Sequence, residues 1–451
     1  MTKRDILVLI VSINIIFFNL GLCYKRYKIS YLGETDQDNV SSIDTSANEA
    51  WNVTFNAKYI DDIHLDSSDN IVILEGDSTS DFWFLRYNNS GTFLGKYTWN
   101  STAGTSNAHA FTIDSQENII IVGTYEKKYD IHVDLFVVKF FQNGTVMWNL
   151  TWSDSIMSCD RGIDVSTDHS DNIYVAVNSY EMVSGTIHNY ILLKFNSNGD
   201  LSWERRGLNN SNTYCFGMVM DSNESIYMAG TNNTYGIVDR TIFLSKYSTT
   251  GKLYGIQSYE TEKLLTLFNI AIDSLDQIYF VGFSENEYKG FLLKYDQNEG
   301  FEWIITYEKG PLEFNYIFID NNNIYIGATR EIGHNEGTEW VSDDTEIYIV
   351  VYNQSGNLVM DGIFDGFGES DKCCGILVDL FDNIYILGIY EQIGFLIRNA
   401  SLRDVIPFPF PPENHENDFL FLLELYLIIS ISIIISSFII SLVFKLSKRR
   451  G

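Results

Sequence analysis

A sevenfold repeat constrains the fold of this chain more than any other feature of its sequence. In each copy a hydrophobic stretch ends in Asp and is followed by a polar turn and a run such as Asn-Ile-Tyr. The copies occupy residues 66–70, 114–118, 168–172, 221–225, 273–277, 320–323 and 379–383. A repeat of about 50 residues with several strands per unit is typical of a radial or stacked β array.

The remainder of the unit predicts three further strands, the last of which is missing from the seventh copy. An almost unbroken apolar run follows the turn, as in residues 173–177, and a strand that is apolar on both faces must be buried on both faces. A third strand of the type Phe-Leu-Leu-Lys-Tyr (291–295) comes next, and a turn of Asn, Ser and Gly leads to a fourth strand that often carries Trp. One such sheet cannot cover its own two hydrophobic faces, so neighbouring sheets must cover them.

We therefore predict an all-β fold: a seven-bladed β-propeller with four-stranded antiparallel blades over residues 46–402. The seventh unit stops after its third strand, at 395–398, whereas residues 51–55 (Trp-Asn-Val-Thr-Phe) match the fourth strand at 148–152. The N-terminal strand is expected to complete the last blade and close the ring, which offsets the loop-closure entropy of a long ring.

The repeat also resembles a known family. Its pattern, Asp-Ser-x-x-Asn-Ile-Tyr-φ-φ-Gly and then Phe-Leu-φ-Lys-Tyr-x-x-x-Gly-x-φ-x-Trp, is similar to the SBBP-type β-propeller repeat of secreted and surface-displayed prokaryotic proteins. The resemblance covers residues 46–402 and is to prokaryotic, archaeal-like, membrane-anchored surface proteins. It implies the propeller fold and carries over no catalytic residue.

The two ends of the sequence predict export and a membrane anchor. Residues 1–23 place Lys3 and Arg4 before an apolar run, as in a signal peptide or an N-terminal anchor. The Pro-rich residues 403–418 predict a stiff stalk. Residues 419–444 include an uncharged run long enough for a transmembrane helix, and the basic tail 445–451 is expected in the cytoplasm. The expected location is the cell membrane, single-pass, with the propeller extracellular.

Composition narrows the partners of that ectodomain. The formal net charge is −29, which disfavours nucleic acid and anionic lipid headgroups as partners. The predicted partners are an extracellular protein or glycan, with the lipid bilayer contacted through the C-terminal helix. Asn-x-Ser/Thr sequons are candidate glycosylation sites. They occur at Asn39, Asn52, Asn88, Asn100, Asn143, Asn149, Asn209, Asn223, Asn232, Asn353 and Asn399.

Cysteine placement predicts a disulfide rather than a metal site. Cys159, Cys215, Cys373 and Cys374 are assigned to connectors that lead from one blade to the next and share one face of a propeller. In an oxidising exterior Cys159 and Cys215, on neighbouring blades, are the most plausible pair. No Cys-x-x-Cys spacing supports a metal site, so none is assigned.

The sequence offers no catalytic motif. It has no His-x-x-x-His spacing and no Gly-x-Ser-x-Gly elbow, so we assign no catalytic residue and no cofactor. The acidic loop 361–371 is an alternative Ca²⁺ site, although it departs from the EF-hand spacing. The repeated Asp is interpreted as a turn former, because its side chain accepts hydrogen bonds from backbone N–H groups two residues on.

Connector variability predicts where a ligand binds. The first-to-second and third-to-fourth turns are uniform, whereas the second-to-third and blade-to-blade connectors differ in every unit and open on the opposite face. Candidate binding residues on this variable face are Tyr125, Tyr129, Tyr180, Tyr235, Arg240, Tyr288, Arg330 and Trp340.

The favoured function is therefore recognition or adhesion, without chemistry, toward a protein, a glycan or an envelope component. Two alternatives stay open. One is an extracellular carbohydrate-active enzyme, a hydrolase or lyase with acidic residues in the central channel. The other is a structural cell-envelope protein.

Overall fold

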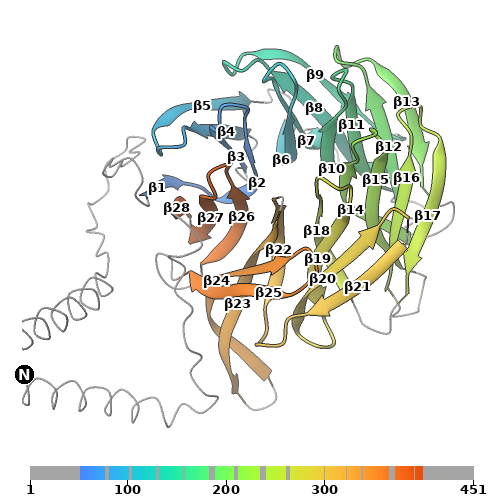
Figure 1. Cartoon of the computed structure of the whole chain (residues 1–451). Coiled ribbons are helices and arrows are strands. Elements are labelled where there is room, and N and C mark those ends of the chain that lie inside the picture. The colour runs from blue at the N-terminus through green and yellow to red at the C-terminus, as the bar shows by residue number, and fades with distance from the viewer. Residues whose placement is uncertain are drawn as a thin grey trace, which may run out of the picture. The chain divides into compact units, whose positions relative to one another are not determined.

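Seven antiparallel sheets of four strands each follow one another around an axis (Figure 1). The computed structural model describes residues 51–76, 81–100, 104–127, 132–155, 158–181, 188–207, 212–233, 240–260, 265–298, 300–320, 322–336, 339–364, 371–390 and 392–399. In this part of the chain the predicted seven-bladed propeller is confirmed.

The strands of each blade are given from the innermost to the outermost. Blade 1 contains β2 (Tyr59–Leu65), β3 (Ile71–Gly76), β4 (Asp81–Tyr87) and β5 (Phe93–Asn100). Blade 2 contains β6 (Gly104–Ile113), β7 (Ile119–Lys127), β8 (Val133–Phe140) and β9 (Val146–Trp152). Blade 3 contains β10 (Ser158–Thr167), β11 (Ile173–Glu181), β12 (His188–Phe195) and β13 (Leu201–Arg206). Blade 4 contains β14 (Asn212–Met220), β15 (Ile226–Asn233), β16 (Arg240–Tyr247) and β17 (Leu253–Tyr259).

The remaining blades repeat this order. Blade 5 contains β18 (Leu265–Ile272), β19 (Ile278–Ser284), β20 (Lys289–Asp296) and β21 (Gly300–Thr306). Blade 6 contains β22 (Glu313–Ile319), β23 (Asn323–Glu336), β24 (Glu339–Asn353) and β25 (Leu358–Phe364). Blade 7 contains β26 (Lys372–Val378), β27 (Ile384–Tyr390), β28 (Ile393–Asn399) and β1 (Trp51–Asn56).

Blade 7 is built from both ends of the described chain. Strand β1 pairs antiparallel with β28, with Trp51 opposite Arg398 and Asn56 opposite Ile393. The Trp51 indole also donates a hydrogen bond from Nε1 to the carbonyl oxygen of Asn89 in blade 1 (3.1 Å). Trp148 and Trp203 make the equivalent bond to the next blade, so Trp51 performs the task of a fourth-strand Trp.

The core lies between the sheets rather than inside any one of them. Residues 71–74 of β3 are fully buried, as the unbroken apolar run predicts. One apolar cluster joins Ile120 and Val137 of blade 2 to Val175 and Ile191 of blade 3, and similar clusters join other neighbours. Each sheet is thus stabilised by burying its apolar faces against the adjacent sheets.

Every innermost strand carries a β-bulge at the same place. The pairing of the first strand with the second shifts by one residue in all seven blades. The extra residues are Asp61, His109, Ile163, Phe216, Phe268, Asn315 and Cys374. A bulge changes the direction of the side chains around it. Simple strand alternation therefore does not predict which residues of the innermost strands face the centre of the ring.

The described residues contain no helix that is both long enough and apolar enough to cross a bilayer. The predicted segments 1–23, 403–418, 419–444 and 445–451 lie outside the described residues.

Candidate functional site

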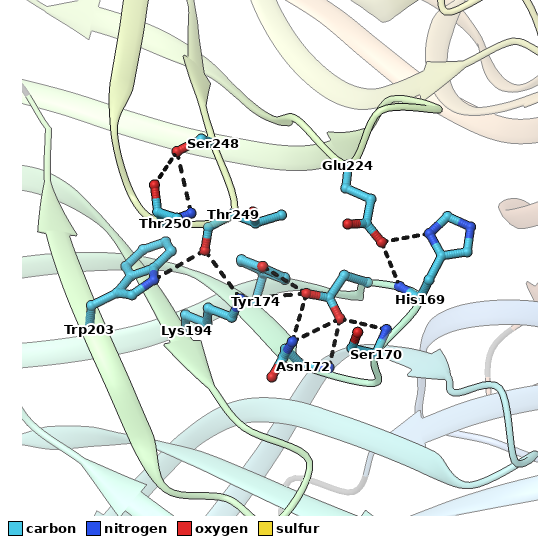
Figure 2. A network of polar contacts seen from close by, with 11 residues as sticks. His169, Ser170, Asn172, Tyr174, Lys194, Trp203, Glu224, Ser248, Thr249 and Thr250 are labelled. Carbon is cyan, nitrogen blue, oxygen red and sulfur yellow. Dashed lines mark hydrogen bonds and ion pairs between the residues drawn. The ribbon is translucent and has the colours of Figure 1, made fainter.

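The repeated Asp organises a turn, as predicted, and also binds the third strand. In blade 3, Asp168 Oδ1 accepts hydrogen bonds from the backbone N–H groups of Ser170 (3.0 Å) and Asn172 (2.9 Å). Its Oδ2 accepts from Asn172 Nδ2 (2.8 Å) and from the Tyr174 hydroxyl (2.9 Å), and Lys194 Nζ lies 3.5 Å away (Figure 2). The Asn-Ile-Tyr motif and the third-strand Lys therefore share one structural task.

The same turns connect neighbouring blades. His169 donates its backbone N–H to Glu224 Oε1 of blade 4 (2.9 Å), and its Nδ1 lies 2.6 Å from the same oxygen (Figure 2). Ser115 bonds to Asp171 and Ser222 to Asp276 in the same way. The uniform turns therefore attach each blade to the next, and we assign no ligand to the face of the ring that they form.

The predicted binding residues lie at one end of five successive blades. Tyr125 and Tyr180 are near the ends of β7 and β11, Arg240 begins β16, and Arg330 and Trp340 are on β23 and β24. They are strand residues, because these second and third strands extend further than the sequence predicted. Tyr288 is in the turn before β20 and is 69% exposed. Tyr129 and Tyr235 lie outside the described residues.

Blade 6 carries a projecting arm on this variable face. The pairing of β22 with β23 ends at Thr329, and the pairing of β25 with β24 ends at Ile347. Strands β23 and β24 nevertheless continue to pair until Glu336 lies opposite Glu339. Residues 330–336 and 339–346, here called the arm, therefore form a two-stranded ribbon that extends from the ring in Figure 1. The connector between the second and third strands of blade 6, expected to be a variable loop, is thus largely a hairpin.

A second candidate site lies in the centre of the ring. A cavity of about 1350 Å³ is lined by residues of all seven innermost strands and extends to the uniform turns. The side chains of Asp61, Asp62 and His64 on β2, His109 on β6 and Asp164 on β10 gather polar and ionisable groups along its wall. The alternative of acidic residues in the channel thus has candidate residues.

Two of these carboxylates bridge adjacent blades. Asp62 Oδ2 accepts a hydrogen bond from Phe111 N of blade 2 (3.2 Å) and lies 3.2 Å from His64 Nε2. Asp164 Oδ2 accepts from Met218 N of blade 4 (2.7 Å). Both side chains are therefore fixed in position by backbone donors of the next inner strand.

Burial and the charges of neighbouring side chains shift the pKa values of Asp164, His64 and His109. Burial, with a further contribution from the charge of Asp62, raises the pKa of Asp164 to about 7. Burial would lower the pKa of His64, but the charge and hydrogen bond of Asp62, together with Asp164, raise it overall. Burial and the charge of Arg161 lower the pKa of His109 to about 4, so this imidazole is neutral at neutral pH.

Asp61, which lines the cavity, and Glu75 on β3 are two buried carboxyl groups whose charges interact. Burial and the charge of Asp62 raise the pKa of Asp61 to about 7. Burial, and also the charge of Asp61, raise the pKa of Glu75 to about 8, against a hydrogen bond from Trp83 and the charge of Lys96. Asp61 Oδ2 and Glu75 Oε1 are shielded from solvent and have no hydrogen-bond partner. Each of these groups therefore favours the protonated state more than an exposed carboxyl does.

The cysteines are placed differently from the prediction. Cys159, Cys215 and the pair Cys373 and Cys374 belong to the innermost strands β10, β14 and β26, because these strands begin earlier than the sequence suggested. All four are buried thiols, and the predicted bond between Cys159 and Cys215 is not formed in the structure. Burial raises the pKa of Cys215 and of Cys373 to about 12, which keeps both thiols protonated at neutral pH.

The acidic loop and the sequons give mixed outcomes. Asp361 contacts Lys309 Nζ (2.8 Å) and accepts a hydrogen bond from the Tyr307 hydroxyl, while residues 365–370 lie outside the described residues. Within the described ranges, no group of three or more His, Cys, Asp or Glu residues is arranged to hold a metal ion. Of the described sequon residues, Asn143, Asn149 and Asn223 are exposed.

Comparison with known proteins shows the fold alone. No protein-family model matches the sequence, and no curated protein matches it. Among solved structures, an ulvan lyase, a polysaccharide lyase, is 11% identical, with coverage of 77% of this chain and 95% of the lyase and a TM-score of 0.50. A puromycin hydrolase is 8% identical, with coverage of 77% of this chain and 54% of the hydrolase and a TM-score of 0.53.

Proposed function

We propose that this protein is a recognition propeller that binds a partner protein or glycan on the variable face. The observation that carries the proposal is the arm, in which β23 and β24 continue to pair with each other beyond the ends of their neighbours β22 and β25. A rigid ring that presents a projecting hairpin suits binding through shape and side-chain contacts, without a chemical step.

The arm has the features of a docking element. Its strands pair with each other from Arg330 opposite Glu346 to Glu336 opposite Glu339, apart from one register shift between Ile332 and Gly333. Beyond Thr329 and Ile347 its outer edges pair with no further strand among the described residues, although Asp371 N donates a hydrogen bond to the Thr345 carbonyl oxygen (2.9 Å) near the base of the arm. An unpaired strand edge offers backbone N–H and C=O groups to an extended peptide, which is the basis of β-augmentation.

The proposal includes display outside the cell. The apolar run in residues 419–444, the basic tail and the resemblance to SBBP-type surface proteins support a single-pass anchor with the propeller extracellular. Under this topology the glycosylation candidates and the acidic surface face the medium. Peptide or glycan partners with basic or neutral surfaces are then favoured by charge.

Shortening the arm tests the assignment. In the variant, residues 331–345 are replaced by an Asn-Gly turn, which joins Arg330 to Glu346, an opposed pair in the native register. The full chain and the variant are applied to arrays of glycans and envelope proteins. We expect ligands that bind the full chain to lose at least about tenfold in affinity, equal to about 1.4 kcal/mol.

A matched control changes surface apolarity elsewhere. Leu201 and Leu253 are exposed on the outer strands β13 and β17, away from the arm, and are both replaced by Ser. This control is expected to bind as the native chain does. If the control weakens binding and the shortened arm does not, the arm is not the recognition element.

One observation favours a second candidate, cleavage of a glycan in the channel. Asp164, whose pKa burial raises to about 7, lines the same cavity as Asp62, and glycan hydrolysis uses an acid and a base drawn from two carboxyl groups. Incubating the chain with a panel of polysaccharides tests this candidate. Product release that disappears in Asp62→Asn and Asp164→Asn, but persists in the shortened arm, would support catalysis over recognition.

A further inference from the structure

The central cavity carries more hydrogen-bond acceptors and more negative charge than the fold itself uses. Asp61, Asp62 and Asp164 line it, and none of the described lining residues is Lys or Arg. The Oδ2 atom of Asp61 and the Oδ1 atom of Asn315 are shielded from solvent and accept no hydrogen bond. The carboxylates of Asp62 and Asp164 line the same cavity and can each accept further hydrogen bonds, so a ligand that brings N–H donors would be stabilised here.

Part of the cavity wall is aromatic. Phe216 and Phe268 are the extra residues of the bulges in β14 and β18, and Tyr316 follows the bulge residue of β22. All three line the cavity. Aromatic faces attract ammonium groups and also cover the alkyl chain that carries them. The lining thus combines carboxylates and aromatic rings, which together suit an alkyl ammonium.

The size of the cavity favours an organic ligand over a metal ion. Its volume of about 1350 Å³ exceeds what a single ion with a few ligands fills. In the part of the chain that the structure describes, no set of three or more metal-binding side chains converges. A metal would also leave the apolar wall without a contact.

We propose that the central cavity binds a small organic cation with primary ammonium groups, held by Asp62 and Asp164 and covered by Phe216 and Phe268. The site is separate from the arm and stands whether or not the variable face is a recognition surface. Asp62 and Asp164 are already fixed by backbone donors from Phe111 and Met218, so little side-chain entropy is lost on binding.

Binding is expected to depend on pH. The ionisable groups that interact with Asp164 are Asp62 and His64 on β2 and Cys215 on β14, and Asp61 on β2 and His109 on β6 line the same cavity. Burial raises the pKa of Asp164 to about 7, and the pKa of His64 is also raised. Raising the pH from about 6 to about 8 removes the proton from Asp164, makes the cavity more negative and tightens cation binding. His109, with a pKa lowered to about 4, stays neutral over this range.

Titration calorimetry on the full chain tests the proposal, with cadaverine as the probe and pentanediol as its neutral isostere. We expect one cadaverine per chain and no heat from pentanediol. Asp62→Asn and Asp164→Asn keep an oxygen acceptor for the backbone donors and are each expected to weaken cadaverine at least about tenfold. Glu126→Gln removes one charge from an exposed position on β7 and is expected to bind normally.

Two further measurements keep the test decisive if a channel Asp variant fails to fold. Phe268→Leu keeps the charge and most of the volume, and we expect a severalfold loss of affinity through the weaker cation–π contact. The native chain should bind more tightly at about pH 8 than at about pH 6. Equal weakening by Glu126→Gln, binding of pentanediol, or an affinity that does not change with pH would overturn the proposal. Cleavage of a polysaccharide abolished by Asp164→Asn, without cadaverine binding, would reassign the cavity to catalysis.

Discussion

Replacing Asp114 by Ala should destabilise the ring more than the same change in any repeat copy that lacks a buried cation. Asp114 Oδ2 lies 2.7 Å from Lys139 Nζ, and both side chains are almost fully buried. The carboxylate also accepts hydrogen bonds from the backbone N–H groups of Gln116 (2.9 Å) and Asn118 (2.8 Å). The Asp114→Ala change removes all of these contacts and leaves the Lys139 ammonium buried without its partner.

The expected loss follows from the two kinds of contact. Breaking a buried ion pair by removing one partner costs about 3–5 kcal/mol. Unpaired backbone donors add to this, while entry of water recovers part of it, so we expect about 4–5 kcal/mol for Asp114→Ala. Burial alone would raise the pKa of Asp114, but hydrogen bonds from Lys139 and Asn118 outweigh it and hold the pKa below its ordinary value. The contribution of this carboxylate is therefore present at neutral pH and is lost as the pH falls through its folded-state pKa.

Blade 5 supplies the matched comparison. Asp273 accepts the same turn bonds, from Leu275 N (2.9 Å) and Gln277 N (2.8 Å), and a bond from the Tyr279 hydroxyl (3.2 Å). Its third-strand lysine, Lys294, is paired with Glu302 (2.8 Å) instead. Asp273→Ala therefore removes turn bonds without stranding a cation, and we expect a loss of about 2 kcal/mol.

Urea unfolding of the full chain, followed by tryptophan fluorescence and circular dichroism, measures both losses where the two signals coincide. We expect Asp114→Ala to exceed Asp273→Ala by about 2–3 kcal/mol at neutral pH and the difference to shrink in acid. Equal losses at neutral pH would refute the claim that the third-strand Lys is part of the repeated structural unit.

Three further outcomes are expected. Glu75→Gln should make the stability of the protein less dependent on pH. The folded-state pKa of Glu75, about 8, exceeds the ordinary value of 4.5, so the native chain loses stability as the pH rises through that range. Thermal unfolding at several pH values measures the difference. Glu117 has a φ of 65°, which is unfavourable for a residue with a side chain, so Glu117→Gly should raise the free energy of unfolding by about 0.5–1 kcal/mol. Asp171 also has a positive φ, but Asp171→Gly should lower the free energy of unfolding by about 1–2 kcal/mol because it removes the hydrogen bonds from Ser115. Both values are read from urea midpoints, and a stabilising Asp171→Gly would contradict the blade-to-blade role. Trp51→Ala should cost about 3–5 kcal/mol and increase proteolysis at the ends of the described chain; an unchanged digestion pattern would show that β1 does not secure blade 7.

The fold could be predicted because each blade repeats the same local solution. Asp168, Asn172 and Tyr174 form the turn through their own side chains, so the turn can be recognised in the sequence. The absence of a fourth strand after 395–398 identifies the strand that begins at Trp51 as its replacement. Strand ends were harder to predict, because β7, β11, β23 and β24 continue beyond the blade into segments that read as connectors. The cysteines were misplaced for the same reason.

The sequence predicted acidic residues in the central channel as an alternative but did not identify them, because bulges decide which side chains line the cavity. In the sequence 59–65, Tyr-Ile-Asp-Asp-Ile-His-Leu, strict alternation would send Asp61 and Asp62 to opposite faces, yet the bulge brings both to the cavity wall. The available signal was chemical. Two adjacent acids inside an otherwise apolar strand, with Glu75 at the end of a fully buried one, are costly unless they serve a purpose.

The position that follows each bulge carries the strongest argument that the ring does more than hold itself together. Its backbone environment is the same in all seven blades, so a purely structural role would favour similar residues there. The seven residues are Asp62, Ala110, Asp164, Gly217, Asn269, Tyr316 and Gly375. Ile270 and Ile63 of the next blades fill the space beside Gly217 and Gly375, whereas two carboxylates line the cavity from blades 1 and 3. A ring whose turns repeat but whose inner wall differs from blade to blade has the asymmetry that a single bound ligand requires.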